Sequence, residues 1–239
     1  MPRRHRMAIA AAALMALLLG VAAMLLTAEH EDSATFSGAV HARRQGQAAV
    51  LFSGDAGFLG AGPEIARTIE DLGLPVYGVS SLAEFRERRT IAQTVGIVND
   101  AVRVARAKFD ADRILLVGHS FGSDVIGAAL PDLAPDVRRA LIGAVLIVPT
   151  DSVYLRADPT ELSYRGPPDA TLSRVQSVNW LPMLCIQGQQ EPDSLCPSLR
   201  ASNVMVMALP GGHALHHDEA QLAAAINRGV TPMLGSGPR

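Results

Sequence analysis

Short, unbroken apolar runs alternate with longer segments of helical period, and this alternation limits the fold more than any other feature of the chain. The runs cover residues 48–52, 75–79, 113–117, 142–148, 183–187 and 204–209. Runs that are apolar at every position are typical of strands buried on both faces. The intervening segments carry apolar stripes at helical spacing, such as Ile65, Ile69 and Leu72. The pattern predicts an α/β fold with a mostly parallel central sheet and helices on both faces.

The first 28 residues carry an export signal. Three arginines within residues 1–6 precede 22 uncharged residues, Met7 to Ala28. A basic segment before an apolar run is read by the export machinery, and its positive charge stays on the cytoplasmic side. We expect residues 1–28 to be a signal peptide or membrane anchor, 29–46 a linker and 47–239 the exported domain. That domain would be periplasmic, either soluble after cleavage or anchored in the inner membrane by residues 7–28.

The charge balance argues against a nucleic-acid partner. The chain has 21 basic and 23 acidic residues, and residues 1–28 hold three of the arginines and no acid. The remainder therefore has 18 basic and 23 acidic residues, a net charge of -5. A protein that binds a phosphate backbone needs a basic surface, which this composition does not supply.

Two cysteines, Cys185 and Cys196, are the only ones in the chain. An even number in an exported protein predicts a disulfide between them. They form no C-x-x-C pair and have no paired histidines at ligand spacing, so no metal site is expected. With both thiols bridged, a cysteine nucleophile is also excluded.

Residues 150–180 interrupt the alternation of strands and helices. This stretch contains three prolines, Tyr154, Tyr164 and Trp180. It is too long for a simple connection between two strands. We interpret it as a short lid over the edge of the sheet.

The strongest chemical signal is G-x-S-x-G at residues 118–122, with Ser120 at its centre. It follows the apolar run 113–117 and precedes a helical segment, which is the strand–turn–helix context of a nucleophile elbow. The small residues allow a turn so tight that the serine hydroxyl is exposed at the start of the helix. We expect an α/β-hydrolase fold with Ser120 as the nucleophile.

A serine nucleophile needs a histidine base and a carboxylate, which follow it along the chain in this fold. His213 comes after Pro-Gly-Gly and the last apolar run, so we expect it to be the base. His216 and His217 are the alternatives at the start of the final helix. Asp193, in the loop after run 183–187, is the expected acid. Asp151 is the second candidate and Glu191 the third.

The oxyanion formed by attack on a carbonyl needs preorganised N–H donors. The backbone amide of Phe121, directly after the nucleophile, is one expected donor. Asp55 or Ala56, in the loop after the first apolar run, is expected to supply the other. That loop is rich in glycine but lacks G-K-[ST], so no nucleotide site is expected there. No cofactor is expected.

Four segments together resemble the VirJ and AcvB type of bacterial virulence proteins, a periplasmic branch of the α/β hydrolases. The resemblance extends over residues 48–226, and most members have Gly, Trp, Tyr and a second His where this chain has Ala56, Phe58, His119 and Ala214. The segments are S-G-D-A-G-F at 53–58, G-H-S-F-G-S-D at 118–124, C-I-Q-G-Q-Q-E-P-D-S-L-C-P at 185–197 and P-G-G-H at 210–213.

The resemblance implies hydrolysis of the ester that joins an amino acid, notably lysine, to phosphatidylglycerol, an aminoacylated phospholipid at the membrane surface. Asp55 and Asp124 are both expected near Ser120, and one of them would attract the cationic aminoacyl group. Alternatively, Asp124 interacts only with the helix dipole or the oxyanion loop.

Two other functions remain open. One is a non-catalytic envelope protein that uses the hydrolase fold to bind secretion substrates or secretion-apparatus proteins, since fold alone does not fix function. The other is a generic esterase or lipase with a different acyl group.

Overall fold

The computed structural model describes residues 33–36, 43–160, 162 and 164–235. The expected signal peptide or anchor, residues 1–28, lies outside these residues. Within the part of the chain that the structure describes, no helix is both long and apolar enough to cross a membrane.

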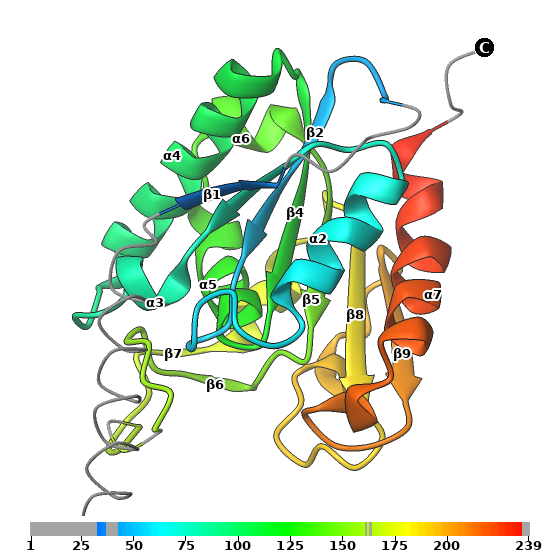
Figure 1. Ribbon diagram of the computed structural model, residues 1–239. Helices are drawn as coiled ribbons and strands as arrows, with labels where there is room; N and C mark the ends of the chain where they lie inside the picture. The colour runs from blue at the N-terminus through cyan, green and yellow to red at the C-terminus, as the bar shows by residue number, and fades with distance from the viewer. Residues whose placement is uncertain (1–32, 37–42, 161, 163, 236–239) are drawn as a thin grey trace, which may run out of the picture.

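Seven strands form one twisted sheet in the order β1-β3-β2-β4-β5-β8-β9 (Figure 1). All neighbouring pairs are parallel except β1 and β3. Every apolar run of the sequence is a strand, which confirms the predicted parallel sheet. The strands are β1 (Ser33–Phe36), β2 (Gln47–Phe52), β3 (Val76–Val79), β4 (Arg113–His119), β5 (Leu141–Ile147), β8 (Met183–Gly188) and β9 (Val204–Leu209).

Strand β1 lies within residues 29–46, where the sequence indicated only a linker. It pairs antiparallel with β3, with Phe36 opposite Val76. The Phe36 ring packs edge-on against Phe58, with 5.2 Å between ring centroids. A four-residue strand with one large apolar side chain has too short a pattern to be distinguished from a polar loop.

Helices cover both faces of the sheet (Figure 1). One face carries α4 (Ile91–Phe109), α5 (Phe121–Ala129) and α6 (Pro135–Ala140), and the other carries α2 (Gly62–Asp71) and α7 (Glu219–Val230). Two separate clusters of buried side chains correspond to these faces. Ile65 and Ile69 of the predicted stripe are buried against the α2 face. The short helix α3 (Ser81–Glu84) follows β3.

Residues 150–180 connect β5 to β8 and contain a two-stranded hairpin, β6 (Ser152–Val153) with β7 (Ala170–Thr171). Val153, Leu155 and Val175 are fully buried in the core on the α5 side. The base of this insertion is therefore packed against the body of the protein. Its Tyr154 and Tyr164 rings stack on each other, with centroids 5.4 Å apart.

Candidate active site

Ser120 lies at the sharp turn between β4 and α5, as the G-x-S-x-G pattern predicts. Its backbone has φ 53° and ψ -122°, a strained conformation for a residue with a side chain. A Cβ at Gly122 would lie 2.2 Å from the carbonyl oxygen of Phe52, and one at Gly118 would lie 2.6 Å from the backbone of Gly122. Both glycines are therefore required because neighbouring backbone occupies the space of a side chain.

Ser123, one turn into the helix, fastens this elbow to β5. Its buried Oγ accepts a hydrogen bond from the Ile147 amide at 2.8 Å and lies 2.7 Å from the carbonyl oxygen of Gly118. The Ser120 amide also donates to the carbonyl oxygen of Ile147, at 2.8 Å. The G-x-S-x-G pattern does not predict this support, although the G-S-D that follows Phe121 places a small polar residue there.

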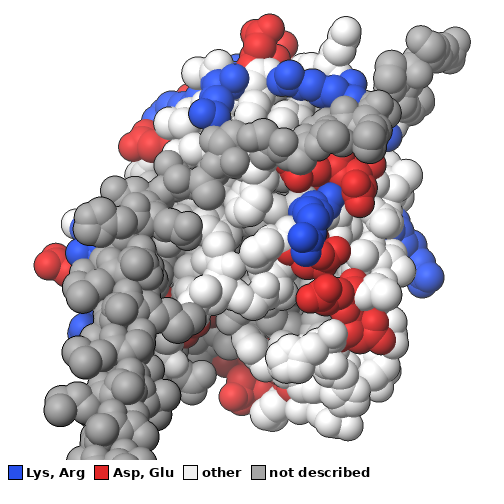
Figure 2. All heavy atoms as spheres, in the orientation of Figure 1, with Lys and Arg blue, Asp and Glu red and all other residues white. Residues whose placement is uncertain are grey.

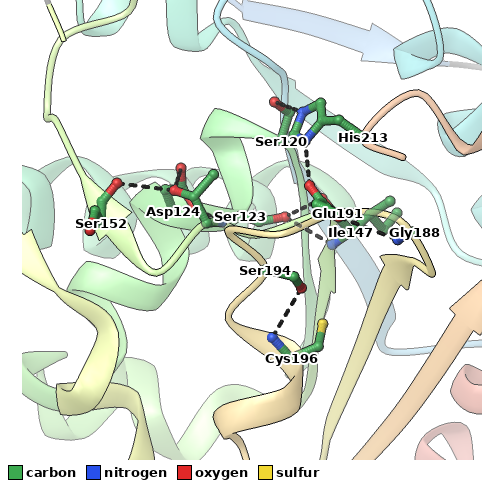
Figure 3. Close-up of polar contacts among 11 residues, drawn as sticks. Ser120, Ser123, Asp124, Ile147, Ser152, Gly188, Glu191, Ser194, Cys196 and His213 are labelled. Atoms are coloured by element: carbon green, nitrogen blue, oxygen red, sulfur yellow. Dashed lines mark hydrogen bonds and ion pairs between the residues drawn. The ribbon is translucent and has the colours of Figure 1, made fainter. Parts of the chain in front are cut away.

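The expected base and nucleophile are in contact. His213 Nε2 lies 2.8 Å from Ser120 Oγ (Figure 3). His213 belongs to the loop after β9, where Gly211 has φ 100°. A Cβ at Gly188 would lie 2.3 Å from the carbonyl oxygen of Gly212, so the end of β8 and this loop pack backbone to backbone.

The carboxylate that contacts His213 is Glu191 and not Asp193. Glu191 Oε1 lies 2.5 Å from His213 Nδ1, and its other oxygen accepts a hydrogen bond from the Gly188 amide at 3.2 Å (Figure 3). The Glu191 side chain is only 5% exposed. Asp193 is exposed, and its backbone carbonyl accepts a hydrogen bond from the Asp151 amide at 2.9 Å. Neither aspartate is the partner of His213.

The conformation of the loop after β8 explains why Glu191, and not Asp193, contacts His213. The chain turns immediately after β8, because the Glu191 amide donates to the carbonyl oxygen of Gly188 at 3.3 Å. This turn points the glutamate toward His213 while the chain is still beside the end of the strand. By residue 193 the loop has paired with the segment after β5, through an isolated bridge between Thr150 and Ser194.

The histidines of the site differ in their proton affinity. The hydrogen bond to Glu191 raises the pKa of His213, partly offset by burial. Burial lowers the pKa of His119 to about 4, with a further contribution from His213. His119 is therefore neutral near pH 7, whereas a carboxylate stabilises the protonated form of His213.

The expected oxyanion-hole residues lie around Ser120. Phe121 is the first residue of α5, and Asp55 and Ala56 lie in the loop after β2. A Cβ at Gly54 would lie 3.8 Å from Ser120 Cβ, so this loop passes directly beside the nucleophile. The loop is fixed from behind by Ser53, whose buried hydroxyl accepts the Ser81 amide at 2.9 Å. Backbone N–H donors can thus approach a carbonyl held at Ser120 from two sides.

An acidic cavity of about 520 Å³ lies on one side of Ser120. Of the residues that the structure describes, no Lys or Arg lines it. Figure 2 shows patches of Asp and Glu among uncharged residues on the lower right of the molecule. The carboxylates that line the cavity are Asp55, Asp124, Asp151, Glu191 and Asp193.

Besides Glu191, two of these carboxylates are engaged by neighbouring groups. Asp55 accepts a hydrogen bond from the Tyr164 hydroxyl at 3.3 Å. Burial raises the pKa of Tyr164, and Asp55 acts in the same direction. Asp124 is 6% exposed, and burial raises its pKa to about 8. Burial thus favours the uncharged form of this carboxyl.

A second groove of about 430 Å³ also borders Ser120, and Asp55, Asp218, Glu219 and three histidines line it together with apolar residues. Its apolar residues come from the loops after β2 and β9, from the first half of α7 and from the insertion 150–180. Leu59, at its edge, is 52% exposed. The apolar residues of the groove are Ala56, Leu59, Ala61, Pro159, Ala214, Leu215 and Leu222.

The structure contains the expected disulfide between Cys185 and Cys196. It ties β8 to the end of the loop that carries Glu191. The same loop end is held by the Leu195 amide, which donates to the carbonyl oxygen of Pro149 at 3.0 Å. No cluster of three or more potential metal-ligating residues occurs among the described residues.

Replacing both cysteines by alanine is expected to destabilise the fold by about 2 to 3 kcal/mol, because the bridge restricts the unfolded chain. We also expect a several-fold lower kcat, since the loop with Glu191 gains freedom. Thermal unfolding with and without reductant, together with ester hydrolysis, measures both effects. The double variant is the control, because reductant should lower the Tm of the wild type only. Equal sensitivity of the two proteins would contradict the assignment.

Comparisons with known proteins agree with this architecture. A family model described as "Bacterial virulence protein (VirJ)" matches residues 46–232. Est1E from Butyrivibrio proteoclasticus has a similar structure, with a TM-score of 0.59, 14% identity and coverage of 85% of this chain and 93% of that chain. A putative dienelactone hydrolase from Klebsiella pneumoniae is also similar, with a TM-score of 0.60, 13% identity and coverage of 82% of this chain and 88% of that chain.

A third similar structure is XC6422 from Xanthomonas campestris, described as an α/β serine hydrolase without lid. It has a TM-score of 0.56 and 19% identity, and covers 87% of this chain and 98% of that chain. A comparison with curated protein sequences finds no match. The sheet order, the elbow and these neighbours identify the α/β-hydrolase fold, and the family model covers most of the chain. The chain therefore belongs to the VirJ family of bacterial virulence proteins.

Proposed function

We propose that this protein is a serine ester hydrolase. The observation that carries the proposal is the continuous chain of contacts from Ser120 Oγ through His213 to Glu191, at an elbow open to a cavity. A nucleophile, a base and an orienting carboxylate at hydrogen-bond distance are what acyl transfer by serine requires. The names of the structural neighbours, which include esterases, support this reading.

In the proposed reaction, Ser120 Oγ attacks the ester carbonyl while His213 Nε2 accepts the hydroxyl proton. Glu191 receives a hydrogen bond from His213 Nδ1–H and stabilises the imidazolium that forms. Amides of the Phe121 and Asp55–Ala56 segments bind the oxyanion. His213 then protonates the leaving alcohol, and an acyl-enzyme remains. Water, deprotonated by the same imidazole, hydrolyses this intermediate and returns Ser120 to its starting state.

For the substrate we propose an aminoacyl ester, with lysyl-phosphatidylglycerol as the family resemblance implies. The acidic cavity supports a cationic acyl group, because its ionised carboxylates attract an ammonium. The apolar residues of the second groove beside Ser120 offer contact for apolar parts of the alcohol. Residues 150–180 supply Tyr154 and Tyr164 to the cavity wall, and we propose that they act as a lid.

An exported, periplasmic location fits this substrate, which would lie at the outer leaflet of the inner membrane. The disulfide supports the same compartment, since such bonds persist in oxidising environments. Residues 1–28 would direct the chain to export, either as a cleaved signal peptide or as a membrane anchor.

The decisive experiment incubates the purified protein with total membrane lipid and compares the lipid profile with that of Ser120→Ala. We expect an aminoacylated lipid to disappear only with the active enzyme. Unchanged lipids together with cleavage of simple esters would replace this substrate by that of a generic esterase or lipase. The envelope-binding alternative, with secretion-apparatus partners, predicts that a fluorophosphonate probe does not label the wild type under conditions where a known serine hydrolase reacts.

Replacing Asp55 by Asn is expected to reduce the preference for a lysine ester over an uncharged acyl ester by about ten-fold. A charge within about 5 Å of the substrate ammonium contributes roughly 1 to 2 kcal/mol in a partly solvated cavity. The ratio of kcat/KM for the two esters measures the change. An unaltered ratio would show that Asp55 does not select the cation.

A further inference from the structure

Asp124 is the buried ionisable group of the site that the proposed reaction does not use. It lies one helical turn after Ser120, and its amide is 3.3 Å from the carbonyl oxygen of Ser120. Its side chain lines the acidic cavity but is directed at Thr150 in the segment after β5. Figure 3 shows Asp124 between the Ser120–His213 pair and Ser152.

Both oxygens of Asp124 bind Thr150. Oδ1 accepts a hydrogen bond from the Thr150 amide at 2.8 Å, and Oδ2 lies 2.9 Å from Thr150 Oγ1. Thr150 Oγ1 is also 3.1 Å from the carbonyl oxygen of Ser152. A hydroxyl has one hydrogen, so it cannot donate fully to both the carboxylate and the carbonyl. All three contacts can form if Asp124 carries a proton on Oδ2. Oδ2–H then donates to Thr150 Oγ1, the Thr150 hydroxyl donates to the carbonyl oxygen of Ser152, and Oδ1 still accepts from the Thr150 amide.

Thr150, which Asp124 binds, lies in the segment after β5, and this segment pairs with the loop after β8 that carries Glu191, here called the acid loop. Thr150 forms a bridge with Ser194, and the Asp151 amide donates to the carbonyl oxygen of Asp193 at 2.9 Å. Glu191 lies two residues before this paired stretch. Helix α5 therefore connects Ser120 to Asp124, and Asp124 is connected through Thr150 to the acid loop. Glu191 of that loop contacts His213, which contacts Ser120.

We propose that Asp124 is a positioning residue that retains its proton and joins the nucleophile helix to the loop carrying Glu191. It is therefore not the carboxylate that attracts a cationic acyl group. This inference rests on the proposed ester hydrolysis for its kinetic consequences, but the proton on Asp124 is a property of the folded protein alone.

The electrostatic surroundings agree with a neutral carboxyl. Burial is the main cause that raises the pKa of Asp124, and Glu191 acts in the same direction. His213 and the hydrogen bonds from Thr150 act in the opposite direction. The exposed carboxylates of Asp151 and Asp193 line the same cavity from the neighbouring loops, and no described Lys or Arg lines it.

Asparagine is the matched test, because its amide copies a protonated carboxyl that accepts from one group and donates to another. We expect Asp124→Asn to keep kcat and the preference for lysine esters within about three-fold of the wild type. Asp124→Ala is expected to lower kcat by about 10- to 100-fold with little change in KM, because small displacements of catalytic groups have effects of this size. Thr150→Val should cause a smaller loss of the same kind. The exposed Asp71→Asn is the control.

A loss of the lysine-ester preference in Asp124→Asn, as expected for Asp55→Asn, would make Asp124 a substrate-binding carboxylate and overturn the proposal. Wild-type kcat in both Asp124→Ala and Thr150→Val would also overturn it. If the wild type itself neither hydrolyses esters nor reacts with a fluorophosphonate, the proposed function fails, and the proton on Asp124 is tested by stability alone.

The stability test follows from linkage. The pKa of Asp124 is raised from 3.8 to about 8, so between these values the folded protein holds one proton more than the unfolded chain. Rising pH therefore favours unfolding across this window. We expect the Tm of the wild type to fall more steeply from pH 5 to pH 8 than the Tm of Asp124→Asn, which has no proton to lose. Parallel curves would show that Asp124 is ionised in the folded protein.

Discussion

Replacing Glu191 by Gln is expected to lower kcat for ester hydrolysis by about 10³- to 10⁴-fold while the fold remains intact. The carboxylate holds His213 in the tautomer whose Nε2 can accept the Ser120 proton, and it stabilises the imidazolium. A glutamine can present its amide N–H to Nδ1 and so favour the opposite tautomer. Steady-state kinetics, with the Tm as a check on folding, measures the effect.

The pH profile provides a second readout of the same substitution. Activity requires neutral His213, so kcat/KM rises as pH increases through the pKa of this ring. Glu191 raises that pKa above its ordinary value of 6.5, which places the acidic limb of the wild-type profile above this pH. In Glu191→Gln the limb should move to lower pH. A residue that only maintained the shape of the loop would reduce the rate without moving the limb.

Asp193→Asn distinguishes between the two acids in the same loop. Its carboxylate is exposed and does not contact His213, so we expect kcat to remain within about three-fold of the wild type. The reverse result, a large loss in Asp193→Asn and a small one in Glu191→Gln, would restore the aspartate as the orienting acid and require the loop to adopt another conformation.

The difference between Asp193 and Glu191 shows where reasoning from the sequence reaches its limit. Continuous apolar runs predict the parallel strands, and strand–turn–helix context predicts the elbow, because both depend on local pattern. The choice of acid depends instead on how a loop turns after β8 and how far each side chain reaches. The turn closed by Gly188 and Glu191, and the pairing of Thr150 with Ser194, are contacts between segments that no local pattern encodes.

The role of Asp124 also depends on a contact between distant segments. Its position four residues after Ser120 correctly predicts that it lies near the nucleophile. The sequence does not reveal that Thr150, 26 residues further along the chain, binds both of its oxygens. An aspartate beside an active site can attract a cation only if it is ionised and accessible, and the partner on a distant loop decides both conditions.

Removing the Ser120 hydroxyl or the His213 imidazole is expected to produce the largest losses, about 10⁶-fold in kcat for either alanine variant. The two side chains are 2.8 Å apart and transfer one proton between them, so neither accelerates the reaction alone. The double variant should therefore be no slower than either single variant. Residual hydrolysis above the uncatalysed rate would come from the oxyanion hole and from substrate binding.

This lack of additivity separates a catalytic pair from two residues that merely line a cavity. Independent contributions would multiply, and the double variant would then be slower than each single variant by the full factor of the other. Labelling by a fluorophosphonate probe supplies a control, because it requires both the hydroxyl and the base but no natural substrate. We expect labelling of the wild type, none of Ser120→Ala, and strongly slowed labelling of His213→Ala. Rapid labelling of His213→Ala would assign the base to another residue, and His217, which lines the second groove beside Ser120, would be examined first.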